Sequence, residues 1–349
     1  MALRTTCIGA FPKPEYVPIR DWFQVGLGTD GYTDEVINGW ADSSDSDVLA
    51  LLDKATAEVV ADQLACGVDL PTDGEVRREN YVHYQCRHFE GFDFEKLTQT
   101  VLRNGAYETS LPTIREQVRA PNPGILVRDW QIAEHAAGRP VKITLPGPMT
   151  ISDTTADAFY TDPERKAHDL ATALNAEILA LADAGCKHIQ IDEPIFARKP
   201  DQALAFGVDT LARCFEGVPA DITSTMHMCC GYPSKLDDHD YPKADQDSYA
   251  RIARRLDGVV DEISIEDAHR HNPADVFELF ETSTLIVGFV AIASSRVETV
   301  DALRSRMTQV LKHVPEDRLI AAPDCGLGFL GRELAMQKLK VLSEAARSI

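Results

Sequence analysis

Short apolar runs alternate with amphipathic segments through most of the chain. The runs are rich in aliphatic and β-branched residues and lie at 4–9, 68–75, 141–148, 187–194, 221–228, 261–266, 284–290 and 318–324. Apolar positions recur at helical spacing over 47–66, 163–185, 200–216, 246–256, 273–281, 296–312 and 331–347. Eight strands, most of them separated by helices, indicate parallel βα units. We therefore predict an α/β fold, a single (β/α)₈ TIM barrel.

Two segments interrupt this alternation. Residues 11–46 are rich in Pro, Gly and Asp, and residues 76–140 are inserted between the second and third predicted strands. Loops of this length in a compact domain are usually functional covers. The chain shows no internal repeat and no linker, so we interpret residues 1–349 as one domain with long loops after strands one and two.

Charge and cysteine usage narrow the classes of function. The net charge of −20 disfavours nucleic acid and anionic membranes, whose phosphates the surface would repel. The eight cysteines are too sparse for a disulfide framework in a chain of 349 residues. The start of the chain lacks a secretory apolar region, and no run approaches the roughly 18 apolar residues of a membrane span. We expect a cytoplasmic protein whose thiolates are available as metal ligands.

Reactive side chains follow the predicted strands where each one ends. A (β/α)₈ barrel assembles its chemistry at the carboxyl ends of the strands. The residues found there are Glu75, Asp192, Glu193, His227, Cys229, Glu266 and Cys325. Taken alone, the Asp192–Glu193–Pro194 segment is also compatible with a simple strand end, and Gly147–Pro148 with an ordinary turn.

His227 and Cys229 stand two residues apart on the fifth strand, so their side chains point to the same side. Zinc accepts histidine, cysteine and carboxylate ligands in a tetrahedral shell. Glu266 and Cys325 could complete that shell from neighbouring strands. The alternative is a buried histidine beside an inert cysteine. The same alternation turns Cys230 away, as a packed core thiol.

Seven motifs occur in an order that resembles one known family. They are IGAFPKP at 8–14, DGEVRREN at 73–80, LPGPMTI at 145–151, IQIDEP at 189–194, MHMC at 226–229, ISIE at 263–266 and PDCGL at 323–327. The chain resembles the cobalamin-independent methionine synthase family, specifically its catalytic C-terminal barrel. The resemblance covers nearly the whole chain.

The resemblance implies a zinc ion held by His227, Cys229, Glu266 and Cys325. Zinc would convert a thiol with a pKa near ~8.5 into a nucleophilic thiolate. The obvious ligand for the incoming thiol to displace is Glu266.

The thiol implied by the family is homocysteine. By the same resemblance, Glu75 and Asp192 hold its amino group, and the backbone of Ile8, Gly9 and Ala10 approaches its carboxylate. The sequence does not identify the partner that orients the His227 ring, which zinc sites generally require.

The chain departs from the family where the family handles folate. The family's D-I-H-S acid pair is matched by Ala291–Ile292–Ala293–Ser294, a folate-contacting tryptophan by Thr154, and the serine of IGSFP by Ala10. The 349 residues also leave no room for the family's second, N-terminal barrel-like domain. A tertiary amine leaves poorly without a proton donor. We therefore expect a methyl donor other than methyltetrahydrofolate, such as methylcobalamin on a corrinoid protein or another alkyl donor.

Three other functions stay open. The first is an alkyltransferase acting on another thiol, like epoxyalkane:coenzyme M transferase, which would need a basic clamp at Arg77, Arg78 or Arg296. The second is a catalytically inactive zinc-binding barrel that serves as a partner subunit. The third is a metal-independent enzyme that uses the carboxylates of Asp192 and Glu193.

Overall fold

A computed structural model describes residues 2–19, 45–102, 107–231, 235–238, 241 and 243–349. Most of the predicted excursion at 11–46 therefore lies outside the described residues. The strands are β1 (Arg4–Thr5), β2 (Glu90–Leu102), β3 (Tyr107–Arg119), β4 (Lys142–Pro146), β5 (Ala156–Asp157), β6 (His188–Asp192), β7 (Thr223–Met228), β8 (Glu262–Glu266), β9 (Thr284–Val290) and β10 (Leu319–Pro323).

Helices follow most strands. They are α2 (Ser46–Ala65), α3 (Tyr81–Arg87), α4 (Val127–Ala137), α5 (Pro148–Asp153), α6 (Pro163–Ala184), α7 (Pro194–Arg198), α8 (Pro200–Gln202), α9 (Val208–Cys214), α10 (Ser248–Leu256), α11 (Ala274–Phe277), α12 (Val300–Val310) and α13 (Arg332–Arg347). A π-helical turn spans Ala203–Gly207, and a 3₁₀ turn spans Glu316–Arg318.

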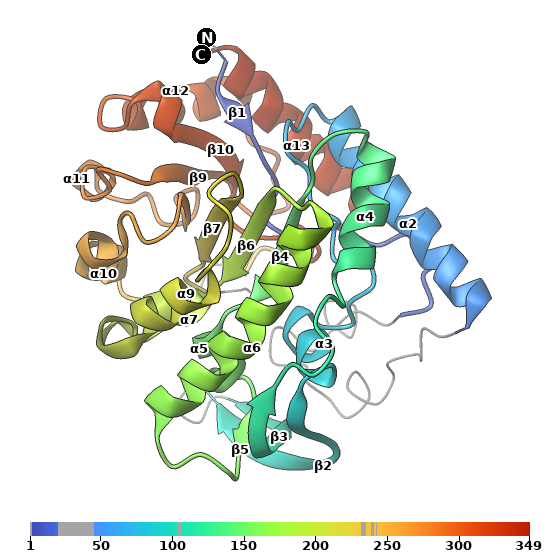
Figure 1. Cartoon of the computed structure of the whole chain (residues 1–349). Coiled ribbons are helices and arrows are strands. Elements are labelled where there is room, and N and C mark those ends of the chain that lie inside the picture. The colour runs from blue at the N-terminus through green and yellow to red at the C-terminus, as the bar shows by residue number, and fades with distance from the viewer. Residues whose placement is uncertain (1, 20–44, 103–106, 232–234, 239–240, 242) are drawn as a thin grey trace.

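The main sheet has seven parallel strands in the order β1-β10-β9-β8-β7-β6-β4. Figure 1 shows this sheet curled, with α2, α4, α6, α12 and α13 outside it. The α/β class and the parallel βα units that we predicted are confirmed.

The second predicted strand, 68–75, has no regular ladder. It makes isolated parallel bridges instead, from Leu70 to Thr6 and from Thr72 to Lys142. Residues 70–72 therefore stand between β1 and β4, at the two edges of the sheet. The positive φ angles of Gly74 (68°) and Glu75 (56°) end the extended backbone there. A complete eight-stranded barrel stays a prediction.

The predicted excursion at 76–140 contains regular structure. It holds α3, a long antiparallel hairpin of β2 and β3, and α4, and β5 adds a third, parallel strand to the hairpin. The hairpin and β5 lie at the end of the sheet opposite the chain termini (Figure 1). Because β1 starts near the termini, that end is where the parallel strands finish.

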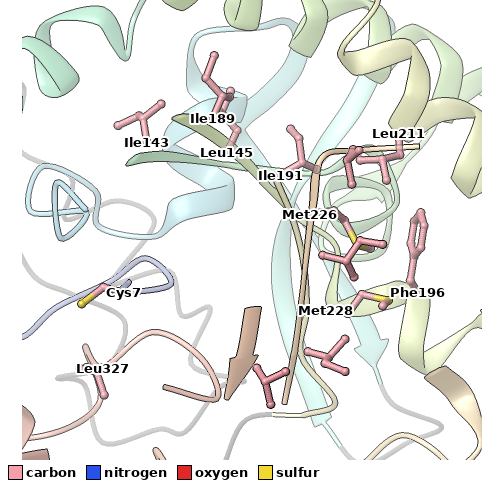
Figure 2. Packing of buried hydrophobic residues seen from close by; sticks show 14 of the residues in the cluster. Cys7, Ile143, Leu145, Ile189, Ile191, Phe196, Leu211, Met226, Met228 and Leu327 are labelled. Atoms are coloured by element: carbon pink, nitrogen blue, oxygen red, sulfur yellow. The ribbon is translucent and has the colours of Figure 1, made fainter. Parts of the chain in front are cut away.

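The two faces of the main sheet carry different side chains. Alternate strand residues point outward and pack against helices in the large apolar core, as Figure 2 shows for Ile143, Leu145, Ile189, Ile191, Met226 and Met228, with Phe196 and Leu211 from helices. The residues between them point inward, because side chains alternate across a strand. On β4, β6, β7 and β8 these inward residues are mostly polar, and they connect to one another by hydrogen bonds.

The helices end where local chemistry predicts. Asp162 caps the start of α6 by accepting the Glu164 N–H, and Gly185 ends that helix with φ of 107°. The segment before β1 contacts the end of α13, where the Leu3 N–H donates to the Ala346 carbonyl at 3.0 Å. Within the part of the chain described, no helix is both long enough and apolar enough to cross a bilayer.

Candidate metal centre

Three predicted ligands converge at the carboxyl ends of β7 and β10. One donor atom from each of His227, Cys229 and Cys325 lies within 4.8 Å of the others. His227 Nε2 is 3.4 Å from Cys325 Sγ, although 98 residues separate the two along the chain. A hydrogen bond from Cys325 lowers the pKa of Cys229 well below the usual thiol range, and His227 lowers it further. The group is therefore arranged to hold negative charge on sulfur.

Ser264 is the orienting partner of His227 that the sequence alone did not identify. His227 and Ser264 face each other across the β7–β8 ladder, and His227 Nδ1 lies 2.9 Å from Ser264 Oγ. This contact leaves Nε2 directed toward the cysteines. Such outer contacts fix the tautomer and ring orientation of a metal-binding histidine. The signal in the sequence is Ser264 itself, two residues before Glu266 in the ISIE segment.

Glu266 ends β8 beside the cluster but is not one of its three close donors. The residue is 2% exposed, and its Oε2 is enclosed without a hydrogen-bond partner among the described residues. Burial raises the pKa of Glu266 well above its usual range, and the nearby charges of Cys229 and Asp324 add to that rise. An enclosed carboxylate oxygen beside two cysteines and a histidine fits a zinc ion as the missing positive charge.

Asp324 supports this end of the sheet from β10. Its carboxylate accepts the backbone N–H groups of Asp267, Ala268 and His269, each at 2.9 Å. Burial raises the pKa of Asp324 to about 7, while these N–H donors act in the opposite direction. Asp324 therefore fixes the turn that follows Glu266 and stands next to Cys325 in the chain.

Tyr241 is a further residue that sequence reasoning missed. It comes from the segment after β7, is 8% exposed, and packs edge-on against His269 with ring centroids 6.0 Å apart. Burial raises its pKa above the usual range, and so do the negative charges of Glu266, Asp324 and Cys229. Its phenol therefore keeps its proton beside the group of His227, Cys229 and Cys325. Nothing in the sequence pattern marks it.

Arg198 was missed for the same reason. It ends α7, and its positive charge contributes to the lowered pKa of Cys229. Its Nε atom is enclosed and has no hydrogen-bond partner within the part of the chain that the structure describes. The arginines that the sequence suggested are placed differently. Arg77 pairs with Asp53 and Asp129, whereas Arg78 pairs with Asp73 and also lies 3.8 Å from the Glu75 carboxylate. The third, Arg296, is exposed.

The predicted amino-group ligands sit on segments next to the cluster. Asp192 ends β6, directly beside His227 in the sheet. Glu75 accepts a hydrogen bond from Thr144 Oγ1 at 2.8 Å, and a Cβ added to Gly9 would lie 2.6 Å from its Oε1. Burial raises the pKa of Asp192 well above its usual range, and Glu75 is the next largest cause. Arg78 lies 3.8 Å from Glu75, so one of these two buried carboxylates already has a cation beside it.

The backbone at Ile8, Gly9 and Ala10 reaches the same place from β1. The Ile8 carbonyl accepts a hydrogen bond from Gln190 Nε2 at 2.7 Å, and the same nitrogen donates to Asp192 Oδ1 at 2.7 Å. The Ala10 carbonyl accepts the Leu327 N–H at 2.7 Å, two residues beyond Cys325. The predicted binding segments are thus tied to Asp192 on one side and to the cysteine loop on the other.

Glu193, the neighbour of Asp192, has a structural position. Its carboxylate accepts the N–H groups of Met149 and Thr150 at 2.8 and 3.0 Å, and the Thr150 hydroxyl at 2.8 Å. It therefore caps the first turn of α5, and a Cβ on Gly147 would collide with it at 2.3 Å. Asp192 and Glu193 do not face one another as a catalytic pair.

Residues 291–294, at the end of β9, carry no acidic side chain of their own, although the Glu298 carboxylate accepts the Ala291 N–H at 3.0 Å. Ile292 and Ala293 are both 1% exposed. The Ala293 N–H donates to His269 Nε2 at 3.3 Å, and its carbonyl accepts the Asp237 N–H at 2.7 Å. Thr154, matched to the family's tryptophan, bonds back to Thr150 of its own helix at 2.7 Å. Small side chains and satisfied backbone groups fill this side of the site.

Comparison with known proteins decides the family. Residues 3–348 match the model of the catalytic domain of cobalamin-independent synthases. The chain belongs to this family. The resemblance inferred from the seven motifs is confirmed.

Individual relatives of the family cover almost all of the chain. The chain is 28% identical to a methionine synthase of Saccharolobus solfataricus, over 99% of this chain and 95% of that one. It is 28% identical to a methionine synthase of Sulfolobus acidocaldarius, over 97% and 89%. A solved B12-independent methionine synthase from Shewanella sp. W3-18-1, in complex with selenomethionine, superposes with a TM-score of 0.85 at 27% identity, over 99% and 97%.

Proposed function

We propose that this protein is a zinc-dependent thiol S-methyltransferase that makes methionine from homocysteine. The observation that carries the proposal is the group formed by His227, Cys229 and Cys325, with the enclosed carboxylate of Glu266 beside it. Membership of the family supports the reaction, and so do relatives called methionine synthase. The Shewanella protein binds selenomethionine, which supports an amino acid as the ligand of this site.

Zinc held by His227, Cys229, Glu266 and Cys325 would supply the acidity that turns the substrate thiol into a thiolate at neutral pH. Ser264 holds the His227 ring in place, and Asp324 holds the turn after Glu266. These contacts orient the ligand side chains before substrate arrives.

The remaining groups bind the amino acid. Glu75 and Asp192 offer two buried carboxylates to the ammonium group, and the backbone of Ile8, Gly9 and Ala10 lies next to them. Their mutual repulsion in the free protein is relieved when an ammonium group enters, which favours an amino-acid thiol over a simple thiol. Burial of the whole group keeps water from the reacting sulfur.

We also propose that the methyl donor is not methyltetrahydrofolate. The end of β9 offers Ala291, Ile292 and Ala293, none of which can protonate a departing amine. A donor with a better leaving group, such as methylcobalamin on a corrinoid protein, needs no such acid. The buried phenol of Tyr241 keeps its proton but faces the metal-binding group.

The fold supports one further proposal. We propose that residues 1–349 form a single (β/α)₈ barrel, closed at 70–72. The bridges of Leu70 to Thr6 and of Thr72 to Lys142 support this closure.

Turnover with separate donors tests the function. Purified, zinc-loaded protein is incubated with homocysteine and either methylcobalamin or methyltetrahydrofolate, and methionine is measured. We expect methionine from methylcobalamin and little or none from the folate. Equal rates from both donors would refute the donor proposal. Methionine formation that survives a chelator would refute the zinc-dependent reaction and favour a metal-independent enzyme, and no methionine from either donor would refute the methyl transfer to homocysteine.

Arg198 supports a second candidate, transfer of an alkyl group to a thiol that carries a sulfonate. Its enclosed Nε, which lacks a partner among the residues described and lies near Cys229, is the kind of donor that a sulfonate would require. Coenzyme M in place of homocysteine tests this candidate. Preferential alkylation of coenzyme M, lost on Arg198→Met, would support it, and exclusive use of homocysteine would reject it.

A further inference from the structure

Lys142 is buried inside the sheet, below the proposed amino-acid site. It is the first residue of β4 and is 0% exposed. Its Nζ atom has no hydrogen-bond partner among the described residues. Burying an ammonium group is costly unless nearby charges compensate it. Neither the proposed ligand set nor the binding carboxylates account for this residue.

The register of the sheet places Lys142 on the inner face. Thr144 points inward to Glu75, and Lys142 stands two residues before it on the same strand. The next residue, Ile143, belongs to the outer core. Lys142 therefore lies one inward step below Thr144, on the same face as the binding carboxylates.

Burial lowers the pKa of Lys142 to about 8. The negative charges of Glu262 on β8 and Asp192 on β6 act in the opposite direction and favour the charged form of Lys142. Glu262 also accepts a hydrogen bond from Thr225 Oγ1 at 3.0 Å, so it has a polar partner of its own. Asp192 receives the single Nε2 of Gln190 at 2.7 Å and is repelled by Glu75.

Gln190 connects this inner layer to the substrate site. It lies beside Thr144 across the β4–β6 ladder, and its Nε2 bonds both Asp192 and the Ile8 carbonyl. Its Oε1 atom is enclosed and has no hydrogen-bond partner in the described segments, on the same face as Lys142 Nζ. A lone donor and a lone acceptor thus stand on the inner face of adjacent strands, directly below the amino-acid site.

We propose that Lys142 is a positioning residue for the amino-acid substrate. Its buried positive charge balances Asp192, so that Asp192 and Glu75 together can receive the substrate ammonium group. The inference rests on the proposed function, because it assumes that the substrate carries an ammonium group. It assigns to Lys142 a role in selecting amino-acid thiols, beyond the stability of the sheet.

Calorimetric binding to zinc-loaded protein tests the inference with two probes. Homocysteine carries the ammonium group, and 4-mercaptobutyrate is the same molecule without it. We expect Lys142→Met to raise the Kd for homocysteine by at least about ten-fold, because one partner of a buried charge group is removed. The Kd for 4-mercaptobutyrate should change by less than about two-fold, because its contacts involve no buried counter-charge. Zinc content should stay at the wild-type level.

Two further variants separate this role from a structural one. Glu262→Gln combined with Lys142→Met removes the other charge that faces the ammonium group. If Lys142 serves only to balance Glu262, the double variant regains homocysteine binding, and that result would overturn the inference. Gln190→Met cuts the link to Asp192 without touching Lys142, and should reproduce the selective loss of homocysteine even if Lys142→Met does not fold. An equal loss of both probes in Gln190→Met would also overturn it.

The wild-type protein distinguishes the two levels of the proposal. If it binds 4-mercaptobutyrate as tightly as homocysteine, the proposed amino-acid substrate is wrong, and the inference fails with it. If it prefers homocysteine and Lys142→Met keeps that preference, only the inference fails.

Discussion

The carboxyl ends of β7 and β9 lie in one sheet, but they carry side chains of different chemistry. At β7, the donor atoms of His227 and Cys229 point inward toward Cys325. Ser264 holds the His227 ring, and Asp324 holds the turn after Glu266. At β9, the side chains are small and apolar, and the backbone is hydrogen-bonded by Glu298, His269 and Asp237. The β7 end is therefore arranged for a ligand, whereas the β9 end is closed by the protein's own side chains. The predictions below test that contrast.

Removing a ligand at β7 should have the largest effect. We expect Cys229→Ala to lose zinc and to lower methionine formation by at least about a thousand-fold, because the metal-dependent step disappears. Zinc is measured by elemental analysis, and turnover with homocysteine. The matched control is Cys230→Ala, whose thiol donates to Tyr249 at 3.0 Å and turns away from the cluster. It should keep its zinc, and equal zinc loss in both variants would contradict the ligand set.

Loosening His227 should have the next largest effect. Ser264→Ala removes the oxygen 2.9 Å from His227 Nδ1. We expect zinc affinity to fall by about 10–100-fold, the usual cost of losing such an orienting contact. Competition with a chromophoric chelator measures the affinity. Ser343→Ala, a buried serine on α13, is the control and should leave zinc affinity unchanged. A Ser264→Ala affinity equal to wild type would show that the ring is held by something else.

Weakening the turn after Glu266 should have a moderate effect. Asp324→Asn replaces one carboxylate oxygen by an amide, facing the three N–H groups of Asp267, Ala268 and His269. We expect the free energy of unfolding to drop by about 1–2 kcal/mol, the cost of an unpaired buried donor. Urea denaturation measures it. Unchanged stability would mean that these hydrogen bonds do not hold the turn.

The closed end of β9 should tolerate change. Ser295→Ala removes the hydroxyl that donates to Asp237 Oδ2 at 2.7 Å, at an exposed position. We expect less than about 1 kcal/mol of lost stability, because water replaces an exposed hydrogen bond. Zinc content and methionine formation should match wild type. A large loss of turnover in Ser295→Ala would contradict the contrast between the two strand ends, because it would show that the loop after β9 takes part in the reaction.

The sequence was sufficient to predict that His227, Cys229 and Cys325 lie together, because strand alternation and strand ends are local properties. His227 and Cys229 share a face since they are two residues apart, and Cys325 follows a strand. The helix expected at 47–66 is found at Ser46–Ala65, capped by Asp45. These features depend on neighbours within a few residues.

The parts that the sequence did not reveal depend on contacts between distant segments. Ser264 meets His227 only because of the β7–β8 register, and Tyr241 reaches the site from a segment with no regular pattern. The hairpin within 76–140 was missed because its register shifts twice, which breaks the alternation along β2. Glu193 looked like a partner of Asp192 until the hydrogen bonds from α5 showed where it points.

The pairing of β1 with β10 affects when the sheet can form during synthesis on the ribosome. Cys325 is synthesised 98 residues after His227. Nearly the whole chain is synthesised before β10, the partner strand of β1, is available. At roughly 5–20 residues per second, about 5–20 s separate the synthesis of His227 from that of Cys325. During that interval the nascent chain can offer a metal ion only part of its final set of donors. The pairing of β1 with β10 is therefore a late event in biosynthesis, because it requires residues synthesised near the end of the chain.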